Sequence, residues 1–217
     1  MKKVVIFGTQ DFAELAHYYL TNDSDCEIVA FSLTEQYLTD KSFKDLPVVP
    51  FETVEETYPP DEFSFFAPMS PSRMNRLRQE IYGQIKGKGY ELISYISSRI
   101  SRFNNEIGDN CFILEDNTLQ PFTNIGNNVV MWSGNHIGHH GTIKDHVFFT
   151  SHVVLSGHCT IEPNCFFGVN STIRDGLHLA EGTLVGMGSS ITKNTEEWSV
   201  YVGNPAKKLD KPSYEAM

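Results

Sequence analysis

The sequence predicts an α/β domain with a small parallel sheet, followed by an all-β solenoid of short parallel strands. The solenoid is predicted by an apolar residue at every sixth position, fifteen times without an insertion. This period fits neither a helix nor a strand and is typical of hexapeptide repeats that form the sides of a triangular coil. Before residue 98, strand-like and helix-like segments alternate instead. The repeating residues are Ile107, Ile113, Leu119, Ile125, Met131, Ile137, Ile143, Phe149, Leu155, Ile161, Phe167, Ile173, Leu179, Val185 and Ile191.

The alternating segments predict βαβ units with a Rossmann-like parallel sheet. The turn Gly8–Phe12 joins the first strand to the first helix, and such a turn is a natural phosphate site. It lacks the full GxGxxG pattern, so a plain strand-to-helix turn remains an alternative. A proline-bearing stretch, 46–60, is predicted to be a connection. The predicted strands are Lys3–Phe7, Glu27–Phe31, Phe63–Ala67 and Glu91–Ile96, and the predicted helices are Asp11–Leu20 and Ser72–Lys88.

The repeats predict about five coils of eighteen residues, in a domain spanning 98–203. Residues 1–97 form the predicted first domain, and 204–217 a terminal loop and tail. Residues eighteen apart would stack at one strand spacing, about 4.8 Å. Small residues mostly occupy the fourth position after each apolar one, which predicts that Cys111, Cys159 and Cys165 are buried as small hydrophobes. Asn128, His146 and Asn164 fall in one column, a candidate side-chain ladder.

Composition restricts the function classes. The chain has 217 residues and a formal net charge of -10, whereas nucleic-acid binders need positive charge to neutralise phosphates. The apolar start, with Lys2 and Lys3, ends at Gly8 and is too short for a signal sequence or a membrane span. We therefore expect a cytoplasmic protein with no nucleic-acid or membrane partner. Four cysteines without a CxxC pair indicate neither a zinc site nor a disulfide framework.

Three segments carry a resemblance to a known family: IGHHGTIKDHVFFTSHVVLSG (137–157), NCFFGVNSTI (164–173) and VYVGNPAKKL (200–209). They resemble the hexapeptide-repeat acyltransferases. With the N-terminal domain, the chain is similar to the bacterial sugar acyltransferases that include sialic acid O-acetyltransferases and nucleotide-sugar 4-N-acetyltransferases. The resemblance implies a left-handed β-helix and a homotrimer with active sites between subunits. It also implies a nucleotide-linked sugar in the N-terminal domain and acetyl-CoA between neighbouring β-helices.

The resemblance implies catalytic roles for His139 and Gly157. A neutral imidazole suits a general base at cytoplasmic pH, and a backbone N–H can stabilise an oxyanion. The eighteen-residue spacing independently places Gly157 one coil from His139. The acids that usually flank the family's histidine are replaced by Gly138 and His140, so His140 or a carbonyl is left to orient the base. The family's second histidine is replaced by Phe148, and Gln10 with its neighbours replaces a glycine–histidine loop.

The resemblance also implies substrate and cofactor contacts. For some of these residues a structural alternative remains: Arg78 could be a solvated charge on a helix and Trp132 a surface aromatic. Lys193 and Lys207 could be solvated surface charges. The expected substrate-binding residues are Gly8, Thr9 and Gln10 at the phosphates, Thr34 and Glu35 after the second strand, Ser70 after the third, Asn75 and Arg78 on the next helix, Trp132 near the sugar, and His140. The expected acetyl-CoA contacts are Gly157, Val169, Met187, Lys193, Pro205, Ala206 and Lys207.

Six of the eight histidines lie between 136 and 158, which raises the alternative of a metal site. The γ-class carbonic anhydrases, which are also β-helices, use histidines thirty-six and five residues apart. No pair here has either spacing, so no metal is expected. His146, His152, His158 and His178 are predicted to be surface or ladder residues.

The predicted function is acetyl-CoA-dependent N-acetylation of a nucleotide-linked amino sugar, a 4-amino-4,6-dideoxyhexose, in surface-glycan biosynthesis. The first alternative is O-acetylation of a sugar such as a sialic acid. More remote alternatives are a non-catalytic β-helix scaffold and a metal hydrolase. The sequence leaves the nucleotide and the sugar stereochemistry open.

Overall fold

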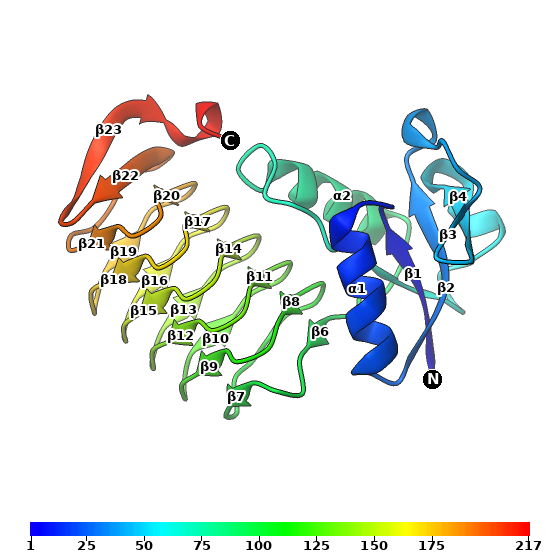
Figure 1. Cartoon of the computed structure of the whole chain (residues 1–217), viewed down its shortest axis with the longest axis horizontal. Helices are drawn as coiled ribbons and strands as arrows, with labels where there is room; N and C mark the ends of the chain where they lie inside the picture. Colours follow the sequence, from blue (N-terminus) through cyan, green and yellow to red (C-terminus); the bar gives the residue numbers. More distant parts are fainter. The chain divides into compact units, whose positions relative to one another are not determined.

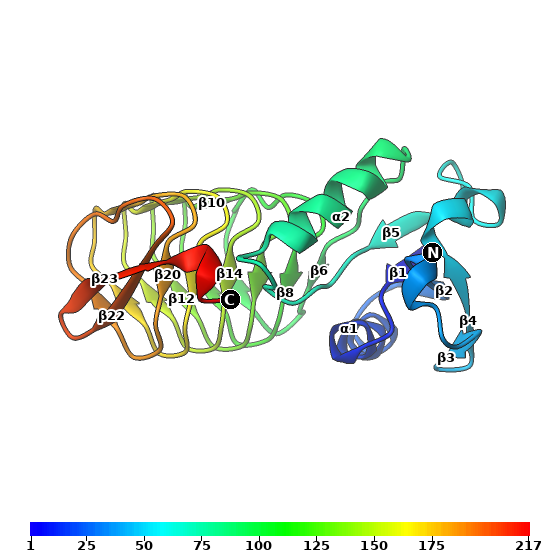
Figure 2. The ribbon, with the colours of Figure 1, turned by 90° about the horizontal axis from the view of Figure 1, so that it is seen from above.

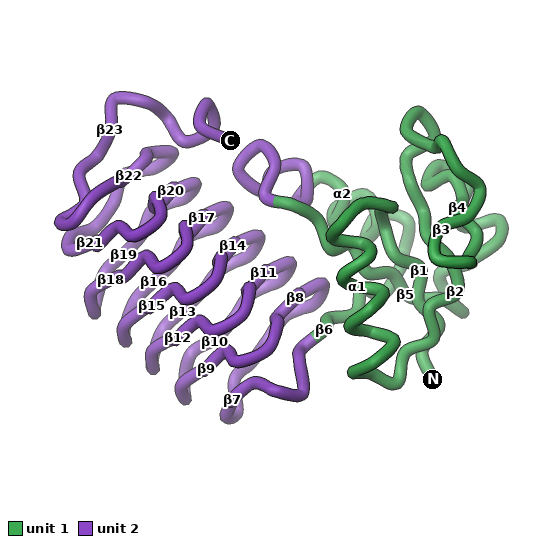
Figure 3. Tube along the Cα trace, in the orientation of Figure 1, with its two compact units in different colours: residues 1–70, 80–95 green, residues 71–79, 96–217 purple.

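A computed structural model describes all 217 residues and divides into two compact units (Figure 3). The first unit contains residues 1–70 and 80–95, and the second contains 71–79 and 96–217. The chain therefore changes unit near residue 96. The assignment of residues 71–79 to the second unit was not indicated by the sequence.

The first unit is built on a five-stranded sheet in the order β3-β4-β2-β1-β5 (Figure 1). β1, β2, β4 and β5 are parallel, and β3 pairs with β4 as an antiparallel hairpin. The last four residues of β1 are buried, which makes this strand the centre of the core. The strands are β1 (Lys2–Phe7), β2 (Cys26–Leu33), β3 (Ser42–Phe43), β4 (Leu46–Pro50) and β5 (Ser64–Phe66), and the helical segments are α1 (Asp11–Asn22), η1 (Glu35–Tyr37) and η2 (Phe51–Glu56).

Three boundaries differ from the sequence-based predictions. β4 lies in the stretch predicted to be a connection: Pro47 is its second residue and Pro50 its last, and it pairs with both β2 and β3. The predicted strand 91–96 is wrong: Leu92 forms only an isolated bridge with Phe65, and the next strand, β6, begins at Tyr95.

The helix predicted from Ser72 begins later, as α2 (Arg76–Gly87). Arg73, Met74 and Asn75 have φ values of 55°, 53° and 66°. Three consecutive residues in the left-handed region cannot continue into a right-handed helix, so the helix starts after them.

The second unit is a solenoid of three sheets, stacked coil upon coil (Figures 1 and 2). Its first sheet contains β6 (Tyr95–Ile96), β8 (Phe112–Ile113), β11 (Val130–Met131), β14 (Phe148–Phe149), β17 (Phe166–Phe167), β20 (Leu184–Val185), β22 (Ser199–Gly203) and β23 (Ala206–Pro212). The second contains β7 (Ser101–Arg102), β9 (Thr118–Leu119), β12 (His136–Ile137), β15 (Val154–Leu155), β18 (Thr172–Ile173) and β21 (Ser190–Ile191). The third contains β10 (Asn124–Ile125), β13 (Thr142–Ile143), β16 (Thr160–Ile161) and β19 (His178–Leu179), and a short helix, η3 (Ser213–Glu215), ends the chain.

The register confirms the eighteen-residue coil. Ile125 pairs with Ile143, Met131 with Phe149, and Ile137 with Leu155. All the repeating apolar residues are buried except Ile107, which is partly buried. The three cysteines at small positions are also buried, and burial raises the pKa of the Cys165 thiol to about 12. These thiols therefore act as small hydrophobes.

The corners of the coil explain why histidine is frequent here. His140, His146, His152 and His158 all have positive φ values between 55° and 65°. Histidine is enriched in the left-handed region, as are asparagine and aspartate. The left-handed backbone conformation of the corners therefore explains most histidines of this segment without a catalytic or binding role.

Neither α1 nor α2, each of twelve residues, is long and apolar enough to cross a lipid bilayer.

Candidate active site

The candidate site in the β-helix is centred on His139, directly after β12 and Gly138. Its backbone N–H donates to Gln120 Oε1 at 3.1 Å, which anchors the corner. Its ring lies against Gly157 of the next coil: a Cβ on residue 157 would lie 2.9 Å from His139 Cε1 and 3.1 Å from Nε2. A side chain at 157 would therefore displace the imidazole from this position, whereas glycine leaves room for it.

Gly157 supplies a free hydrogen-bond donor beside that ring. Its carbonyl accepts a hydrogen bond from the Gly176 N–H at 2.9 Å, whereas its own N–H has no acceptor in the chain. Gly157 is partly exposed, and a backbone N–H without an acceptor in the same corner as His139 is suited to stabilising an oxyanion.

His140 and His158 complete a group of three exposed histidines. The Nδ1 atoms of His139 and His140 are 3.0 Å apart, a hydrogen bond whose donor depends on the tautomer. His158 donates its backbone N–H to the His139 carbonyl at 2.8 Å, and its ring stacks on His140 with centroids 5.1 Å apart. His158 is exposed and stacks in one column with His140, as predicted for a surface or ladder residue, but its proximity to His139 was not anticipated. The sequence feature that could have predicted this cluster is the eighteen-residue spacing of His140 and His158, which places them in one column.

Four of the seven residues expected to contact acetyl-CoA fall into two columns. Gly157 and Lys193, which follow β15 and β21, belong to the corner that carries His139. Val169 and Met187 follow β17 and β20 at another corner, and both are exposed. A single chain therefore presents these residues on two different edges of its solenoid.

The terminal loop lies in the β22–β23 hairpin, where Gly203 pairs with Ala206 and Pro205 follows a cis peptide bond. Lys207 and Lys193 form no ion pair within the chain, so their charges are available to a ligand. Lys208, by contrast, is paired with Glu196.

Asn75 and Arg78 do not face a substrate, which corrects the expectations for both. Each is fully buried within the second unit. Arg78 donates to the Asn128 carbonyl, to the His146 carbonyl at 2.8 Å and to Asn75 Oδ1 at 2.9 Å. Burial lowers the pKa of Arg78 to about 9, so it stays charged at neutral pH. Neither a phosphate contact nor a solvated helix charge fits this environment.

Asn75 completes the same buried network by donating its amide to the carbonyls of Asn164 and Cys165, at 3.1 and 3.2 Å. The predicted ladder is present in part: Asn128 Nδ2 lies 2.9 Å from His146 Nδ1, but Asn164 Nδ2 donates to Gln79 Oε1 instead. Burial, helped by the charge of Arg78, lowers the pKa of His146 to about 4. His146 is therefore a neutral structural residue.

Trp132 follows β11, one corner before His139 on the same coil, and is partly buried. Its carbonyl accepts hydrogen bonds from the side-chain amides of Asn117 and Asn135.

In the first unit, the turn after β1 opens into a cavity of about 370 Å³. It brings together four predicted residues, Gly8, Thr9, Gln10 and Ser70. Gly8 has a φ of 103°, which favours glycine, and its N–H donates to the Ser32 carbonyl at 2.8 Å. The other lining residues are Phe7, Asp11, Phe12, Ala13, Leu33, Pro68 and Met69.

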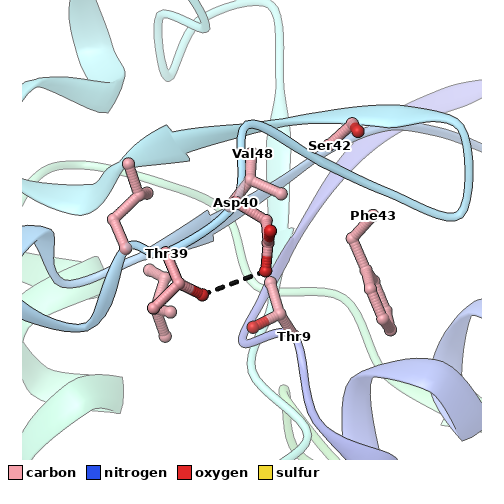
Figure 4. Close-up of a pocket in the computed structure, with 8 residues that line it drawn as sticks. Thr9, Thr39, Asp40, Ser42, Phe43 and Val48 are labelled. Atoms are coloured by element: carbon pink, nitrogen blue, oxygen red, sulfur yellow. Dashed lines mark hydrogen bonds between the residues drawn. The ribbon is translucent and has the colours of Figure 1, made fainter.

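A second cavity of about 160 Å³ shares Thr9 and Leu33 with the first. Figure 4 shows Asp40 accepting a hydrogen bond from the Thr39 hydroxyl at 3.0 Å on one side of it and Phe43 on the other. The sequence did not single out these residues. Thr34 and Glu35, which it did, line neither cavity, and the Glu35 N–H donates to Glu52 Oε2 at 3.0 Å. The lining residues are Thr9, Leu33, Leu38, Thr39, Asp40, Ser42, Phe43 and Val48.

Comparison with known proteins supports the predicted fold. Residues 159–193 match a family model described as the hexapeptide repeat of succinyl-transferase. The acetyltransferase domain of PglB from Neisseria gonorrhoeae is similar over 96% of this chain and 100% of that chain, with 18% identity and a TM-score of 0.82. A mutant of perosamine N-acetyltransferase from Caulobacter crescentus, in complex with CoA and GDP-perosamine, is similar over 97% and 98%, with 17% identity and a TM-score of 0.83. WeeI from Acinetobacter baumannii matches over 96% and 100%, with 18% identity and a TM-score of 0.76.

These matches span both units of the chain. They confirm the predicted fold class, a Rossmann-like α/β domain followed by a left-handed parallel β-helix. Hexapeptide-repeat acetyltransferases have this fold. At this level of identity the likeness concerns the fold, so the chemistry has to be argued from the residues of this chain.

Proposed function

We propose that this chain, which has the fold of the hexapeptide-repeat acetyltransferases, is an acetyl-CoA-dependent N-acetyltransferase of a nucleotide-linked amino sugar. The observation that carries the proposal is the His139 ring held against Gly157, whose N–H is free. Two solved structures of the same fold support the choice of ligands, one in complex with acetyl coenzyme A and one with CoA and GDP-perosamine.

His139 acts as the general base in this proposal. When its Nδ1–H donates to His140 Nδ1, the unprotonated nitrogen is Nε2, on the side of Gly157. Nε2 removes a proton from the sugar amine as the amine nitrogen attacks the thioester carbonyl. A new C–N bond forms, the C–S bond breaks, and the proton passes to the leaving thiolate of CoA.

Gly157 stabilises the transition state. The carbonyl oxygen of acetyl-CoA becomes an oxyanion during the attack and accepts a hydrogen bond from the Gly157 N–H. Such a donor contributes a rate factor of about 10²–10³ when it is preorganised. No carboxylate is paired with His139, which favours an amine over a sugar hydroxyl, because an amine is the stronger nucleophile and needs less help from a base.

The nucleotide is proposed to bind in the first unit, with its phosphates at Gly8, Thr9 and Gln10, where the cavity meets the start of α1. The adjoining cavity of Thr39, Asp40 and Phe43 offers hydrogen-bonding groups and an aromatic face to the rest of the nucleotide. Asp11 also lines the first cavity, so its carboxylate has to turn away from a bound diphosphate or be neutralised.

A homotrimer is part of the proposal. Val169 and Met187 lie at a different corner of the solenoid from His139 and Gly157, so a cofactor that contacts both sets needs two neighbouring chains. Light scattering coupled to size exclusion should give three times the chain mass of 24.5 kDa. A monomer in solution would contradict a site formed between subunits.

The activity is tested with acetyl-CoA and a panel of UDP-, dTDP- and GDP-linked sugars carrying either a 4-amino group or a hydroxyl. Thiol release reports turnover, and mass spectrometry identifies an amide or an ester. His139→Ala should lower kcat/KM by about 10²–10⁴-fold, the usual contribution of a general base. His152→Asn, a change at an exposed histidine outside the cluster, is the control and should keep the wild-type rate. Equal rates for His139→Ala and wild type would refute the assignment of the base.

A further inference from the structure

We propose that His139, His140 and His158 form a binding site for a divalent transition-metal ion of the zinc type, and that the bound ion inhibits the enzyme. Each histidine offers one ring nitrogen, and these three atoms all lie within 4.8 Å of one another. Metal binding requires only this cluster, whereas the inhibitory consequence rests on the proposed function of His139.

The geometry is close to what a tetrahedral ion requires. Zinc binds imidazole nitrogen at about 2.0–2.1 Å, so two ligand atoms across a tetrahedral angle are roughly 3.3 Å apart. The Nδ1 atoms of His139 and His140 are already 3.0 Å apart. The three ring centroids are separated by 5.0 to 5.1 Å, so small rotations of the rings bring the third nitrogen into range.

The backbone holds the three residues in place before any ion arrives. His140 and His158 stand eighteen residues apart in left-handed corners, with φ values of 55° and 58°. The His158 N–H is bonded to the His139 carbonyl, which ties the two coils together at the cluster. All three side chains are exposed, so an ion can reach them and a water or substrate atom can take the fourth position.

The chemistry of imidazole selects the ion. Neutral imidazole is a ligand for zinc, copper, nickel and cobalt, whereas magnesium and calcium prefer oxygen. No carboxylate belongs to the cluster, which argues further against a hard cation.

Inhibition follows from the single free lone pair of a neutral imidazole. If His139 gives that lone pair to a metal ion, its other nitrogen carries a proton and cannot accept another from the sugar amine. The metal is thus an inhibitor that competes with catalysis for the same imidazole, and no step of the proposed reaction uses it.

The test titrates the metal-free chain of residues 1–217 with Zn²⁺ by calorimetry and with Co²⁺ by visible absorption. Wild type should bind one ion per chain with the d–d bands of a tetrahedral site. His158→Asn should weaken binding by at least tenfold and remove those bands, because asparagine keeps the left-handed turn but lacks the imidazole. His152→Asn, a histidine-to-asparagine change in an equivalent turn outside the cluster, should bind like wild type.

The absence of saturable binding, or equal binding by wild type and His158→Asn, would overturn the site. For inhibition, Zn²⁺ should lower the acetylation rate of wild type and a chelator should restore it. His158→Asn, compared with its own metal-free rate, should need at least tenfold more Zn²⁺. Stoichiometric binding without any effect on the rate would overturn the inhibitory role. Failure of the proposed function is distinguishable, because a chain that acetylates no sugar still gives a clear result in both titrations.

Discussion

At the residue scale, the contact between His139 and Gly157 is the most demanding feature of the candidate site. The ring occupies the space where a Cβ of residue 157 would lie. The same glycine therefore does two things: it leaves room for the imidazole and it exposes a backbone N–H beside it. A coil spacing of eighteen residues makes this possible, because it aligns the two corners.

Gly157→Ala is therefore expected to lower kcat by about 10²-fold, the cost of a displacement of about 1 Å of a reacting group. The added methyl group would lie 2.9 Å from His139 Cε1 and push the ring out of position. Steady-state kinetics measure the effect. Gly83→Ala, where an added methyl group contacts nothing, is the control and should leave kcat unchanged. A wild-type kcat for Gly157→Ala would mean that the ring is not positioned by this contact.

At the element scale, the segment that leads into α2 is fixed by buried polar groups. Arg73–Asn75 form a left-handed turn, and Asn75 and Arg78 anchor it with hydrogen bonds to four backbone carbonyls of the corners that carry Asn128, His146 and Asn164–Cys165. Left-handed residues other than glycine cost free energy, so this turn is maintained by the network around it.

Arg78→Met should destabilise the protein by about 3–5 kcal/mol, because the buried carbonyls that accept from the guanidinium lose their partner. Urea unfolding at neutral pH measures the change. Lys86→Met, an exposed position on the same helix, should stay within about 0.5 kcal/mol of wild type. If Arg78→Met cost less than about 1 kcal/mol, packing of the helix rather than this network would be the source of the stability.

At the scale of the whole molecule, His146 links stability to pH. The folded protein holds the pKa of His146 at about 4, against an ordinary value of 6.5. Between these values the unfolded chain binds more protons than the folded chain, so the stability contributed by His146 is present above pH 6.5 and is lost as the pH falls towards 4. Burial away from water lowers the pKa of His146 most, and the positive charge of Arg78 lowers it further. The carboxylate of Asp145 raises it by a smaller amount.

The free energy of unfolding of the wild type should fall between about pH 7.5 and about pH 5. In His146→Asn this fall should be smaller by about 2 kcal/mol. Asparagine suits the left-handed backbone at this position, where φ is 65°, so the fold tolerates the change. Urea unfolding at the two pH values measures the difference, with His152→Asn as the control. An identical pH dependence of wild type and His146→Asn would mean that His146 titrates normally in the folded protein.

The β-helix could be predicted from the amino-acid sequence, because a period of six places one apolar residue on each side of each coil and so converts sequence spacing into distance. The same spacing placed Gly157 beside His139 and buried three cysteines. Spacing could not reveal which way a side chain points. Arg78 was therefore expected at a phosphate, whereas the tertiary structure buries it under carbonyls from distant coils. The strand β4, the left-handed turn before α2 and the Asp40 cavity likewise depend on neighbours remote in the chain. Both the sequence and the structure are needed to identify the three-histidine cluster. The repeat spacing stacks His140 on His158, and only the folded corner brings their rings close to His139.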